Sequence, residues 1–422
     1  MNQQNDNSSP SSNKRTPTQV KDIVIEKDNG FDVDWDSIEE NVQQSKRHRH
    51  RRKTHSRRTG HSTNSATGAT KLRHTVSVDE QDDNKKKSPI IKILIAVLIL
   101  FLCIVIGVLI SFFILRYRGK LALLGNQELN ITSIDEAVSK DNGKTVTYNG
   151  ETYTFNPYVT SVLFMGVDKE ELELENNVVG TGGQADAIYL LTYDTAGGKL
   201  KIISFSRDTM VDINTYTTSG KYAGVENAQL CLAYAYGDGK AVSAENVVTS
   251  LQRIIYNIPI NAYFAMDLSA IKVLNDDIGG VNLTSLETFN GFTEGENVTL
   301  MGDMAEIYVR ARDVSKLDSN ITRMARQQQY LTAFSNQLVP AVQKDISLPL
   351  DLYNDAKNYV VTDLTPSKIT YLTSAIVSSY DGFEMVSVPG EITASETDGK
   401  AQFIPDKVAL YEIILDTFYT KE

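Results

Sequence analysis

Two observations predict a layered α/β fold for residues 121–422 of this chain of 422 residues. Short runs of β-branched and aromatic residues alternate with longer amphipathic segments, which is typical of a sheet covered by helices. About 300 residues are also enough to enclose one large hydrophobic core. Because the region contains no internal repeat, we expect a single large domain.

Four stretches rich in β-formers are predicted to be strands or hairpins: residues 145–155, 159–170, 185–194 and 199–213. In the first, Asn149-Gly150 is a typical hairpin turn. The second is an apolar run ending in Gly-Val-Asp, so a buried strand would deliver Asp168 at its end. The third begins near Asp186, and the fourth reaches Arg207 and Asp208. Six further stretches are predicted to be helical: about 226–236, 244–257, 267–279, 320–343, 366–379 and 406–420.

Residues 93–115 form an uncharged apolar run of 23 residues. As a helix the run would be about 34 Å long at 1.5 Å per residue, enough to cross a bilayer. The length of the run and the lack of a small-residue cleavage site after it disfavour a cleaved signal peptide, and a buried core helix is the alternative. Lys and Arg are more abundant before the run than after it. This bias predicts a single-pass protein of the cell membrane, with a cytoplasmic N-terminus and an extracytoplasmic C-terminal domain.

Residues 1–88 hold 17 basic and 13 acidic side chains and few large apolar ones. Such a composition cannot bury enough surface to offset the ordering entropy, so we expect a disordered basic cytoplasmic tail. Its basic block is either a solvated topogenic segment or a site for anionic lipid or nucleic acid. We expect five regions along the chain. They are the tail (1–88), a transmembrane helix with its flanks (89–118), a membrane-proximal linker and hairpin (119–158), the core of the domain (159–345) and the C-terminal part of the same domain (346–422).

Histidine and cysteine usage excludes several classes of enzyme. All five histidines lie in the tail, and Cys231 is the only cysteine beyond the apolar run. The domain therefore has no Ser-His-Asp or Cys-His catalytic set, and no zinc site built on histidine or paired cysteine. Any metal is expected to be a hard cation held by oxygen, such as Mg²⁺ or Mn²⁺.

Arginine is concentrated in one short stretch of an acidic domain. Residues 121–422 hold 40 acidic and 21 basic side chains, and only six of the basic ones are arginine. Four of the six lie within 17 positions: Arg310, Arg312, Arg323 and Arg326. If residues 306–313 are a strand, the first two share a face. If a helix begins near Ser319, Arg323, Arg326 and Gln327 form one stripe in its first two turns.

Four guanidinium groups near a helix N-terminus are expected to surround an anion, because the free N–H groups there also favour one. Carboxylates of the acidic domain are one candidate partner. Phosphate or pyrophosphate is the other, and we favour it because guanidinium groups bind phosphate oxygens in pairs. Asp168 and Asp186, at two strand ends, could hold a divalent cation beside the phosphates, although cap or turn roles account for either residue at least as well.

Six segments, in order and spacing, resemble the LytR-CpsA-Psr family of cell-envelope proteins between residues 159 and 330: VLFMGVD, ADAIYLLTYD, ISFSRDTMVDI, LAYAYGDG, IPINAYFAMDLSAIKVLNDDIGGV, and YVRARD followed by RMARQQQ. The resemblance implies an αβα sandwich with a central mixed β-sheet and an apolar slot for a lipid tail. It also implies transfer of a phosphorylated glycopolymer, such as a teichoic acid or capsule, from a polyprenyl-pyrophosphate carrier to a peptidoglycan hydroxyl. Mg²⁺ would lie between two aspartates and the pyrophosphate.

Carried over by position, the resemblance implies two metal ligands, Asp168 and Asp186. It implies a pyrophosphate-binding set in which Arg326 has a supporting place: Arg207, Arg310, Arg312, Arg323, Arg326 and Gln327. The resemblance implies a catalytic set of four arginines and two aspartates: Arg207, Arg310, Arg312, Arg323, Asp186 and Asp208. Either aspartate could accept the proton of the acceptor hydroxyl.

Three positions depart from the family pattern. Gln184 stands where an arginine usually lies two residues before the aspartate. Asn320 stands where an aspartate usually precedes the helix, although Asp318 is close, and the segment ENAQLC replaces one that contains Lys, Asn and His. Turnover or substrate choice is therefore in question.

Three functions remain open: the transferase, a lipid-pyrophosphate phosphatase that uses water as acceptor, and a non-catalytic polyprenyl-phosphate binding or scaffold protein. An acidic domain outside the membrane argues against nucleic acid as a partner. Nothing in the sequence indicates the oligomeric state.

Overall fold

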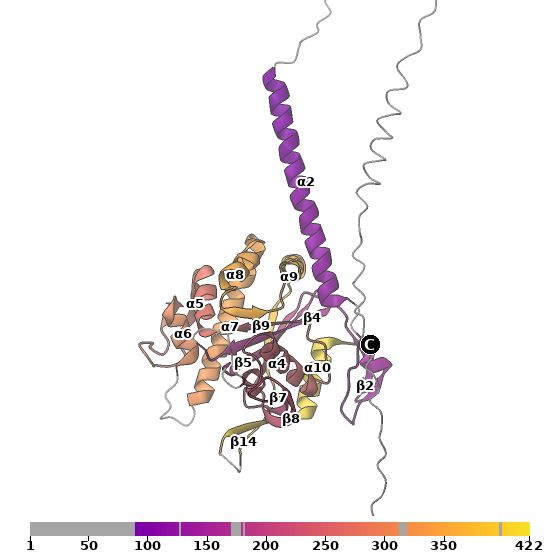
Figure 1. Ribbon diagram of the computed structural model, residues 1–422, viewed down its shortest axis with the longest axis vertical. Helices are drawn as coiled ribbons and strands as arrows, with labels where there is room; N and C mark the ends of the chain where they lie inside the picture. Colours follow the sequence, from indigo (N-terminus) through magenta and orange to yellow (C-terminus); the bar gives the residue numbers. More distant parts are fainter. Residues whose placement is uncertain (1–88, 126–127, 170–178, 180–181, 312–318, 396–398) are drawn as a thin grey trace, which may run out of the picture. The chain divides into compact units, whose positions relative to one another are not determined.

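The structure is a computed structural model that describes residues 89–125, 128–169, 179, 182–311, 319–395 and 399–422. The predicted tail, residues 1–88, lies outside the described residues. All described residues belong to one compact unit, 86–422. Figure 1 shows its helices and strands.

A six-stranded sheet forms the centre of the domain, in the order β12-β9-β4-β5-β6-β13. Its strands are β4 Val159–Val167, β5 Ala185–Asp194, β6 Leu200–Phe205, β9 Ala262–Met266, β12 Val360–Thr362 and β13 Phe383–Ser387. The β4–β9 and β6–β13 pairs are parallel, and the other three pairs are antiparallel. The predicted central mixed β-sheet is therefore confirmed.

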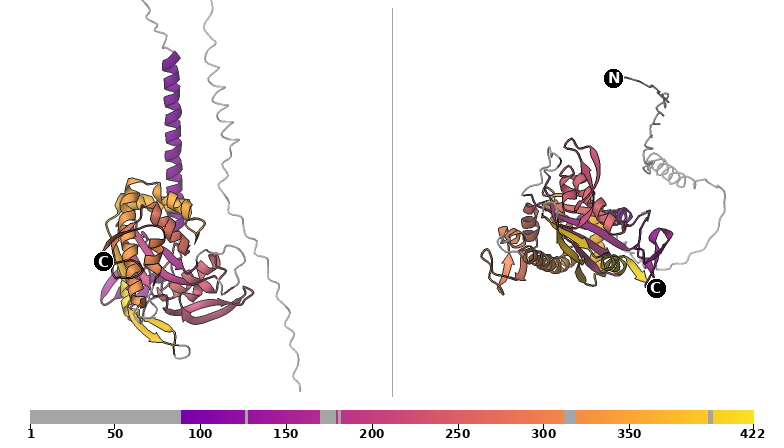
Figure 2. Two further views of the ribbon diagram at one scale, coloured as in Figure 1. Left: turned by 90° about the vertical axis from the view of Figure 1, so that its left-hand side faces the viewer. Right: turned by 90° about the horizontal axis from the view of Figure 1, so that it is seen from below.

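Side chains of β4 alternate between two apolar layers, as the pleat of a strand requires. Leu163, Met165 and Val167 are fully or almost fully buried on one face, where they pack against α3 Leu232–Ala235, α4 Ala241–Ile254 and α10 Lys407–Phe418. Phe164, between them in the chain, packs on the other face. That face carries α5 Leu268–Asp277, α6 Asp303–Arg310, α7 Ser319–Lys344, α8 Leu348–Ala356 and α9 Pro366–Ser379. The predicted αβα layers are thus observed (Figures 1 and 2).

In the described part of the chain, four smaller sheets and ribbons lie around the central sheet. The predicted Asn-Gly hairpin is confirmed as β2 Thr145–Tyr148 and β3 Glu151–Phe155, and the last strand, β16 Tyr419–Lys421, pairs with β3. The remaining elements here are β1 Val138–Lys140, the 3-10 turn η1 Asp141–Gly143, and the ribbons β7 Met210–Tyr216 with β8 Tyr222–Gln229, β10 Val281–Thr284 with β11 Asn297–Leu300, and β14 Gly390–Ala394 with β15 Ala401–Pro405. The β14–β15 ribbon projects from the body of the domain (Figure 2).

Two predicted elements differ in extent or type. The strand expected at 199–213 is two strands, because Arg207 and Asp208 lie in a turn where Thr209 Oγ1 donates to the Ser206 carbonyl at 2.7 Å. The helix expected at 226–236 is in part strand, because residues 226–229 belong to β8 and only the four residues Leu232–Ala235 are helical. Pairing of β8 with β7 over seven residues overrides the local preference of the sequence.

The strand expected at 306–313 is wrong, because its described part is the end of helix α6. Ala305, Tyr308 and Val309 are buried at the i, i+3, i+4 spacing of a helix face. Asp303 and Glu306 in the first turn also suit the helix dipole. Arg310 is therefore a last-turn residue of a helix, and Arg312 lies outside the described residues.

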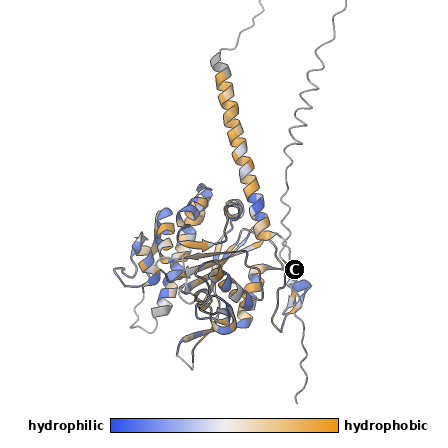
Figure 3. Cartoon of the chain, in the orientation of Figure 1, coloured by the Kyte–Doolittle hydropathy of each residue, from blue (hydrophilic) through white to orange (hydrophobic). Residues whose placement is uncertain are grey.

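Helix α2, Pro89–Leu124, contains the apolar run predicted to cross a membrane. Residues Ile93–Leu124 make it the one helix in the described part of the chain that is long and apolar enough to span a bilayer. Figure 3 shows that most of this helix consists of hydrophobic residues. The helix extends six residues past the boundary expected at 118. These last turns pack on the domain: Arg116 Nε donates to Ser374 Oγ at 2.9 Å, and Asn261 Nδ2 donates to the Leu123 carbonyl at 2.9 Å.

Candidate functional site

A cavity of about 390 Å³ lies between the central sheet and the helices of one layer. Its lining side chains come from β4, β5 and the end of β9, and from α5, α6 and α7. One part of the wall is polar and carries Asp168, Asp186, Arg310, Arg323 and Gln327. The rest is mainly apolar: Phe164, Met266, Ile271, Leu274, Leu331 and Phe334. A single cavity therefore joins a charged end to an apolar interior.

Two strand ends deliver the two aspartates of the polar part, as predicted. Asp168 follows β4 directly. Asp186 lies in a β-bulge, because Gly166 pairs with Ala187 whereas Val167 pairs with Ala185, which leaves Asp186 without an opposite residue. The bulge breaks the strict alternation of side chains along β5, so that both Asp186 and Ala187 line the cavity.

The chain just before β5 holds the Asp168 carboxylate. The backbone N–H of Gln184 donates to Asp168 Oδ1 at 2.6 Å. This approach depends on Gly183, whose φ of +86° is in the region that favours glycine. A Cβ at Gly183 would also lie 2.8–3.1 Å from Lys169, Val167 and Asp168.

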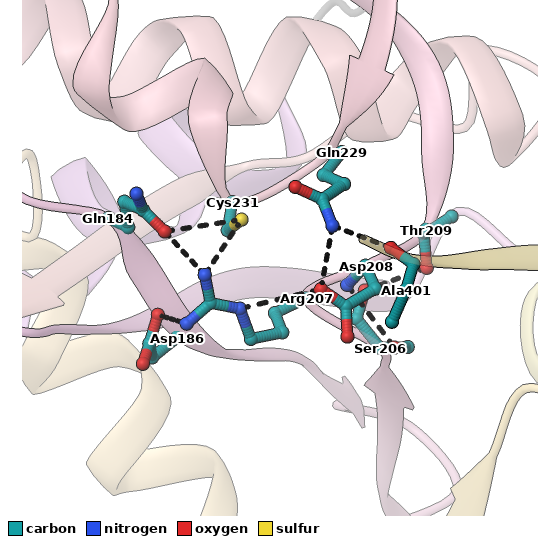
Figure 4. Close-up of polar contacts among 9 residues, drawn as sticks. All are labelled: Gln184, Asp186, Ser206, Arg207, Asp208, Thr209, Gln229, Cys231 and Ala401. Carbon is teal, nitrogen blue, oxygen red and sulfur yellow. Dashed lines mark hydrogen bonds and ion pairs between the residues drawn. The ribbon is translucent and has the colours of Figure 1, made fainter. Parts of the chain in front are cut away.

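Arg207 lies at the centre of a polar network beside the cavity (Figure 4). Its Nη1 donates to Asp186 Oδ1, and its Nη2 donates to Gln184 Oε1 and, at 3.4 Å, to Cys231 Sγ. Its Nε is 3.7 Å from Asp208 Oδ1. Arg207 also lines a small hollow together with Arg323, Gln327 and Asp186, so the network continues into the wall of the cavity.

Helix α7 begins at Ser319, where the sequence predicts the start of a helix. Its residues Arg323 and Gln327 line the cavity. The Gln327 side chain donates from Nε2 to the Val309 carbonyl at 3.0 Å, which joins α7 to α6. Arg326 is not part of the cavity wall, because its side chain is buried against Glu287 and Phe289 instead. The expected stripe therefore holds for two of its three members.

Arg326 does not line the cavity and is buried between α6 and α7. Its side chain is 2% exposed, and its guanidinium lies 3.9 Å from the centre of the Phe289 ring. It donates to the carbonyl oxygens of Tyr308 and Ala311 and pairs with Glu287 at 2.9 Å. Arg326 thus fastens the start of α7 to the end of α6.

The family profile described as LytR_cpsA_psr matches residues 124–415. The chain belongs to this family.

Two relatives in the LytR-CpsA-Psr family have names that state an activity. The polyisoprenyl-teichoic acid–peptidoglycan teichoic acid transferase TagU of Bacillus cereus is 24% identical over 235 residues, which are 55% of this chain and 69% of TagU. The transferase TagV of Bacillus subtilis, named in the same words, is 28% identical over 192 residues, which are 43% of this chain and 44% of TagV. A crystal structure of a Streptococcus agalactiae protein covers 62% of this chain and 89% of that chain, with 20% identity and a TM-score of 0.51, so the two share a fold.

The residues expected from the LytR-CpsA-Psr resemblance fall into three groups. Asp168, Asp186, Arg310, Arg323 and Gln327 meet in the cavity. Arg207 adjoins them through Asp186, and Asp208 lies behind Arg207, where its Oδ1 accepts from Gln229 Nε2 at 3.1 Å. Arg326 is buried between α6 and α7, and Arg312 lies outside the described residues.

Asp168 and Asp186 of the cavity carry carboxylate oxygens, which are suitable ligands for the expected divalent cation. Mg²⁺ is usually held by one or two carboxylates together with substrate phosphate oxygens and water. Within the described part of the chain, no group of three or more His, Cys, Asp and Glu side chains could hold a metal. A cation at Asp168 and Asp186 would therefore take its remaining oxygens from a bound phosphate or from water.

Sequence reasoning missed Cys231 and Gln229 as partners of the site. Cys231 is fully buried beside Arg207, and burial raises the pKa of its thiol to about 11, so the thiol is neutral at physiological pH. Gln229 Nε2 links Asp208 to the Ala401 carbonyl of β15 at 2.6 Å. Both residues belong to the ENAQLC segment, whose departure from the LytR-CpsA-Psr pattern was the one indication in the sequence.

A charge-preserving and a charge-removing variant of Arg207 are expected to have different pH profiles. Burial raises the pKa of Asp186, Arg207 lowers it in part, and the charge of Asp168 raises it further. Activity that needs the ionised Asp186 should therefore rise with pH above the usual range of an aspartate. Arg207→Gln removes the lowering, so the acid limb of kcat/KM should move to higher pH. Arg207→Lys should leave the limb near its wild-type position, and an unshifted limb in the Gln variant would contradict this electrostatic link.

Proposed function

We propose that this protein moves a glycopolymer phosphate from a polyprenyl-pyrophosphate carrier to a peptidoglycan hydroxyl. One observation carries the proposal: a single cavity presents arginines and aspartates at one end and an apolar wall over the rest. A polyprenyl pyrophosphate has the same division into an anionic head and an apolar tail. Membership of the LytR-CpsA-Psr family, whose relatives include proteins named as teichoic acid transferases, supports the same substrate class.

The polar end suits a diphosphate head group. Arg310 and Arg323 approach it from α6 and α7, and a guanidinium binds phosphate oxygens through two parallel N–H bonds. Arg310 is half exposed and is paired with Glu306 at 3.0 Å. An exposed pair of this kind holds little free energy, so Arg310 can turn to an incoming phosphate at small cost.

The apolar part of the cavity suits the lipid tail. Phe164 of β4, Ile271 and Leu274 of α5, and Leu331 and Phe334 of α7 line it from three sides. Each isoprene unit that binds against these side chains is removed from water. This burial contributes about 25 cal/mol of binding free energy for each Å² of apolar surface. The tail therefore supplies binding free energy, whereas the head group fixes the position of the reacting phosphorus.

The proposed reaction is one displacement at the phosphorus that carries the glycan. The oxygen of the acceptor hydroxyl forms a new P–O bond, the bond to the bridging pyrophosphate oxygen breaks, and polyprenyl phosphate leaves with both bonding electrons. Arg310 and Arg323 bind the oxygens on which negative charge develops. Asp186 lines the cavity and is placed to accept the hydroxyl proton, whereas Asp208 lies behind Arg207. Mg²⁺ or Mn²⁺ held by Asp168 and Asp186 would supply further neutralisation of the pyrophosphate.

Helix α2 supports a membrane location for this reaction. The excess of Lys and Arg before the apolar run predicts a single-pass protein with a cytoplasmic N-terminus and an extracytoplasmic domain. A lipid-linked donor and a cell-wall acceptor meet at that face of the membrane. Teichoic acid is the polymer class that the names of the relatives support.

The test is a transfer assay with the full chain in nanodiscs, a polyprenyl-pyrophosphate-linked glycan, Mg²⁺ and peptidoglycan fragments. We expect glycan-phosphate on the peptidoglycan and release of polyprenyl phosphate, both dependent on the acceptor. Release that is equally fast without peptidoglycan would indicate a phosphatase instead. Tight donor binding without release in Mg²⁺ or Mn²⁺ would indicate a binding or scaffold protein.

A further inference from the structure

Gln184 contacts two groups of the site in two different ways. Its backbone N–H donates to Asp168 Oδ1 at 2.6 Å, and its side-chain Oε1 accepts from Arg207 Nη2. Arg207 in turn donates to Asp186. One residue therefore connects the carboxylate at the end of β4 to the guanidinium that holds the carboxylate in the bulge of β5. Figure 4 shows the contacts of Arg207 with Gln184 and Asp186.

We propose that Gln184 is a positioning residue that fixes Arg207 and Asp168 relative to each other, and that its neutral side chain leaves the charge of Arg207 available to the phosphates. The proposal rests on the function proposed above. It assigns a role to the side chain at a position where the family pattern has arginine.

The electrostatic surroundings of Arg207 explain why a neutral acceptor suits this place. A guanidinium only donates hydrogen bonds, so the amide of Gln184 presents its oxygen to Arg207. Arg207 is already paired with Asp186 and lies 3.7 Å from Asp208. Arg207 therefore already faces two carboxylates, and a third would add negative charge that repels pyrophosphate. Gln184 accepts a hydrogen bond from Arg207 and so restrains the guanidinium without adding a negative charge.

Cys231 contacts the same nitrogen of Arg207 as Gln184 does. Its Sγ lies 3.4 Å from Arg207 Nη2 and 3.7 Å from Gln184 Oε1. Its backbone carbonyl accepts from the Ala185 N–H at 3.3 Å, and its own N–H donates to the Arg207 carbonyl at 3.1 Å. Gln184 and Arg207 therefore both contact Cys231, which restrains the positions of their side chains relative to each other.

Two substitutions of Gln184 distinguish its effect on the position of Arg207 from its effect on the local charge. Gln184→Ala removes the acceptor, so Arg207 loses a restraint and kcat should fall by about 10- to 100-fold, the range seen when the partner of a site residue is removed. Gln184→Glu retains an acceptor and adds a negative charge, so kcat should remain within a fewfold of wild type. The affinity for pyrophosphate should then fall by about tenfold or more, because a buried like charge opposes the anion. A merely structural residue would not divide its effect between kcat and affinity in this way.

The experiment measures the affinity of the full chain in nanodiscs for inorganic pyrophosphate by calorimetry, together with kcat and KM for the lipid-linked donor. Gln343→Ala and Gln343→Glu are the matched controls, because Gln343 is an exposed residue near the far end of α7. Thermal unfolding is measured for every variant. If Gln184→Ala does not fold, Gln184→Glu alone carries the test, because its loss of pyrophosphate affinity at near-normal kcat is specific to the charge argument.

The outcomes separate this inference from the proposed function. If the wild-type chain binds no pyrophosphate and transfers no glycan, the proposed function fails and this inference fails with it. If the wild-type chain is active and both Gln184 variants match the Gln343 controls within about twofold, the proposed function stands and the positioning role is overturned. A fall in kcat for the alanine variant and in affinity for the glutamate variant supports the role.

Discussion

Replacing Arg323 by alanine is expected to lower kcat/KM for the lipid-linked donor by about 10²- to 10³-fold while the fold persists, the loss typical when one stabilising donor is removed from a reaction centre. Arg323 comes from the second turn of α7 into the polar part of the cavity, and it also lines the hollow beside Arg207. With Arg310→Ala added, no cation is expected to face the pyrophosphate from α6 or α7 among the described residues, and transfer should become undetectable.

The control for this prediction is Arg253→Ala. Arg253 is one of the few other arginines in the domain, and its guanidinium binds the Asp212 carbonyl at 2.6 Å and Asn214 Oδ1 at 2.8 Å on the β7 strand. It does not belong to the lining of the described cavity. Transfer by the Arg253 variant should equal that of wild type. A well-folded Arg310/Arg323 double variant with unchanged transfer would remove the proposed site.

The same substitution at Arg326, three residues further along α7, is expected to destabilise the protein by roughly 3 kcal/mol or more. Removing the guanidinium would leave the Glu287 carboxylate and two carbonyl oxygens without their partner. It would also remove the contact of the cation with the Phe289 ring. Arg326→Lys should recover only part of this loss, because one ammonium nitrogen cannot reach partners that are spread over the three nitrogens of the guanidinium.

Urea unfolding followed by circular dichroism measures this effect, and the Arg323 variant is its matched control on the same helix. We expect the unfolding midpoint of Arg326→Ala to be well below that of Arg323→Ala. Similar midpoints would mean that the buried arginine is not a stabilising link between α6 and α7. The pair of variants therefore distinguishes an arginine that acts on substrate from one that holds the site together.

Local sequence signals predicted the elements that begin and end with clear caps. Asp267 caps α5 by accepting from the Ala270 N–H, and Thr365 with Pro366 begins α9. Both helices lie within two residues of their predicted limits because a cap depends on neighbours in the chain. Strands β4 and β5 were predicted for a similar reason, since each is a short stretch rich in apolar and aromatic residues.

Long-range packing decided the elements that the sequence did not predict. Residues 306–310 have no strong local preference, and the burial of Tyr308 against Phe289 and Phe292 makes them helical. Cys231 reaches Gln184 only because α3 begins beside the start of β5, 47 residues away in sequence. Clustered arginines predicted the place of the site, whereas the separate role of Arg326 follows from its burial and not from its spacing.

The direction of the Asp186 side chain depends on the number of residues in β5 and not only on their identity. The bulge inserts one residue opposite the Gly166–Val167 step. Deleting Asp186 would restore regular pairing, because Ala185 and Ala187 would then lie opposite the consecutive residues Val167 and Gly166. Substitutions along β5 should therefore be tolerated more readily than changes of length, and a natural variant that gained or lost one residue at this point would keep its sheet and lose its carboxylate.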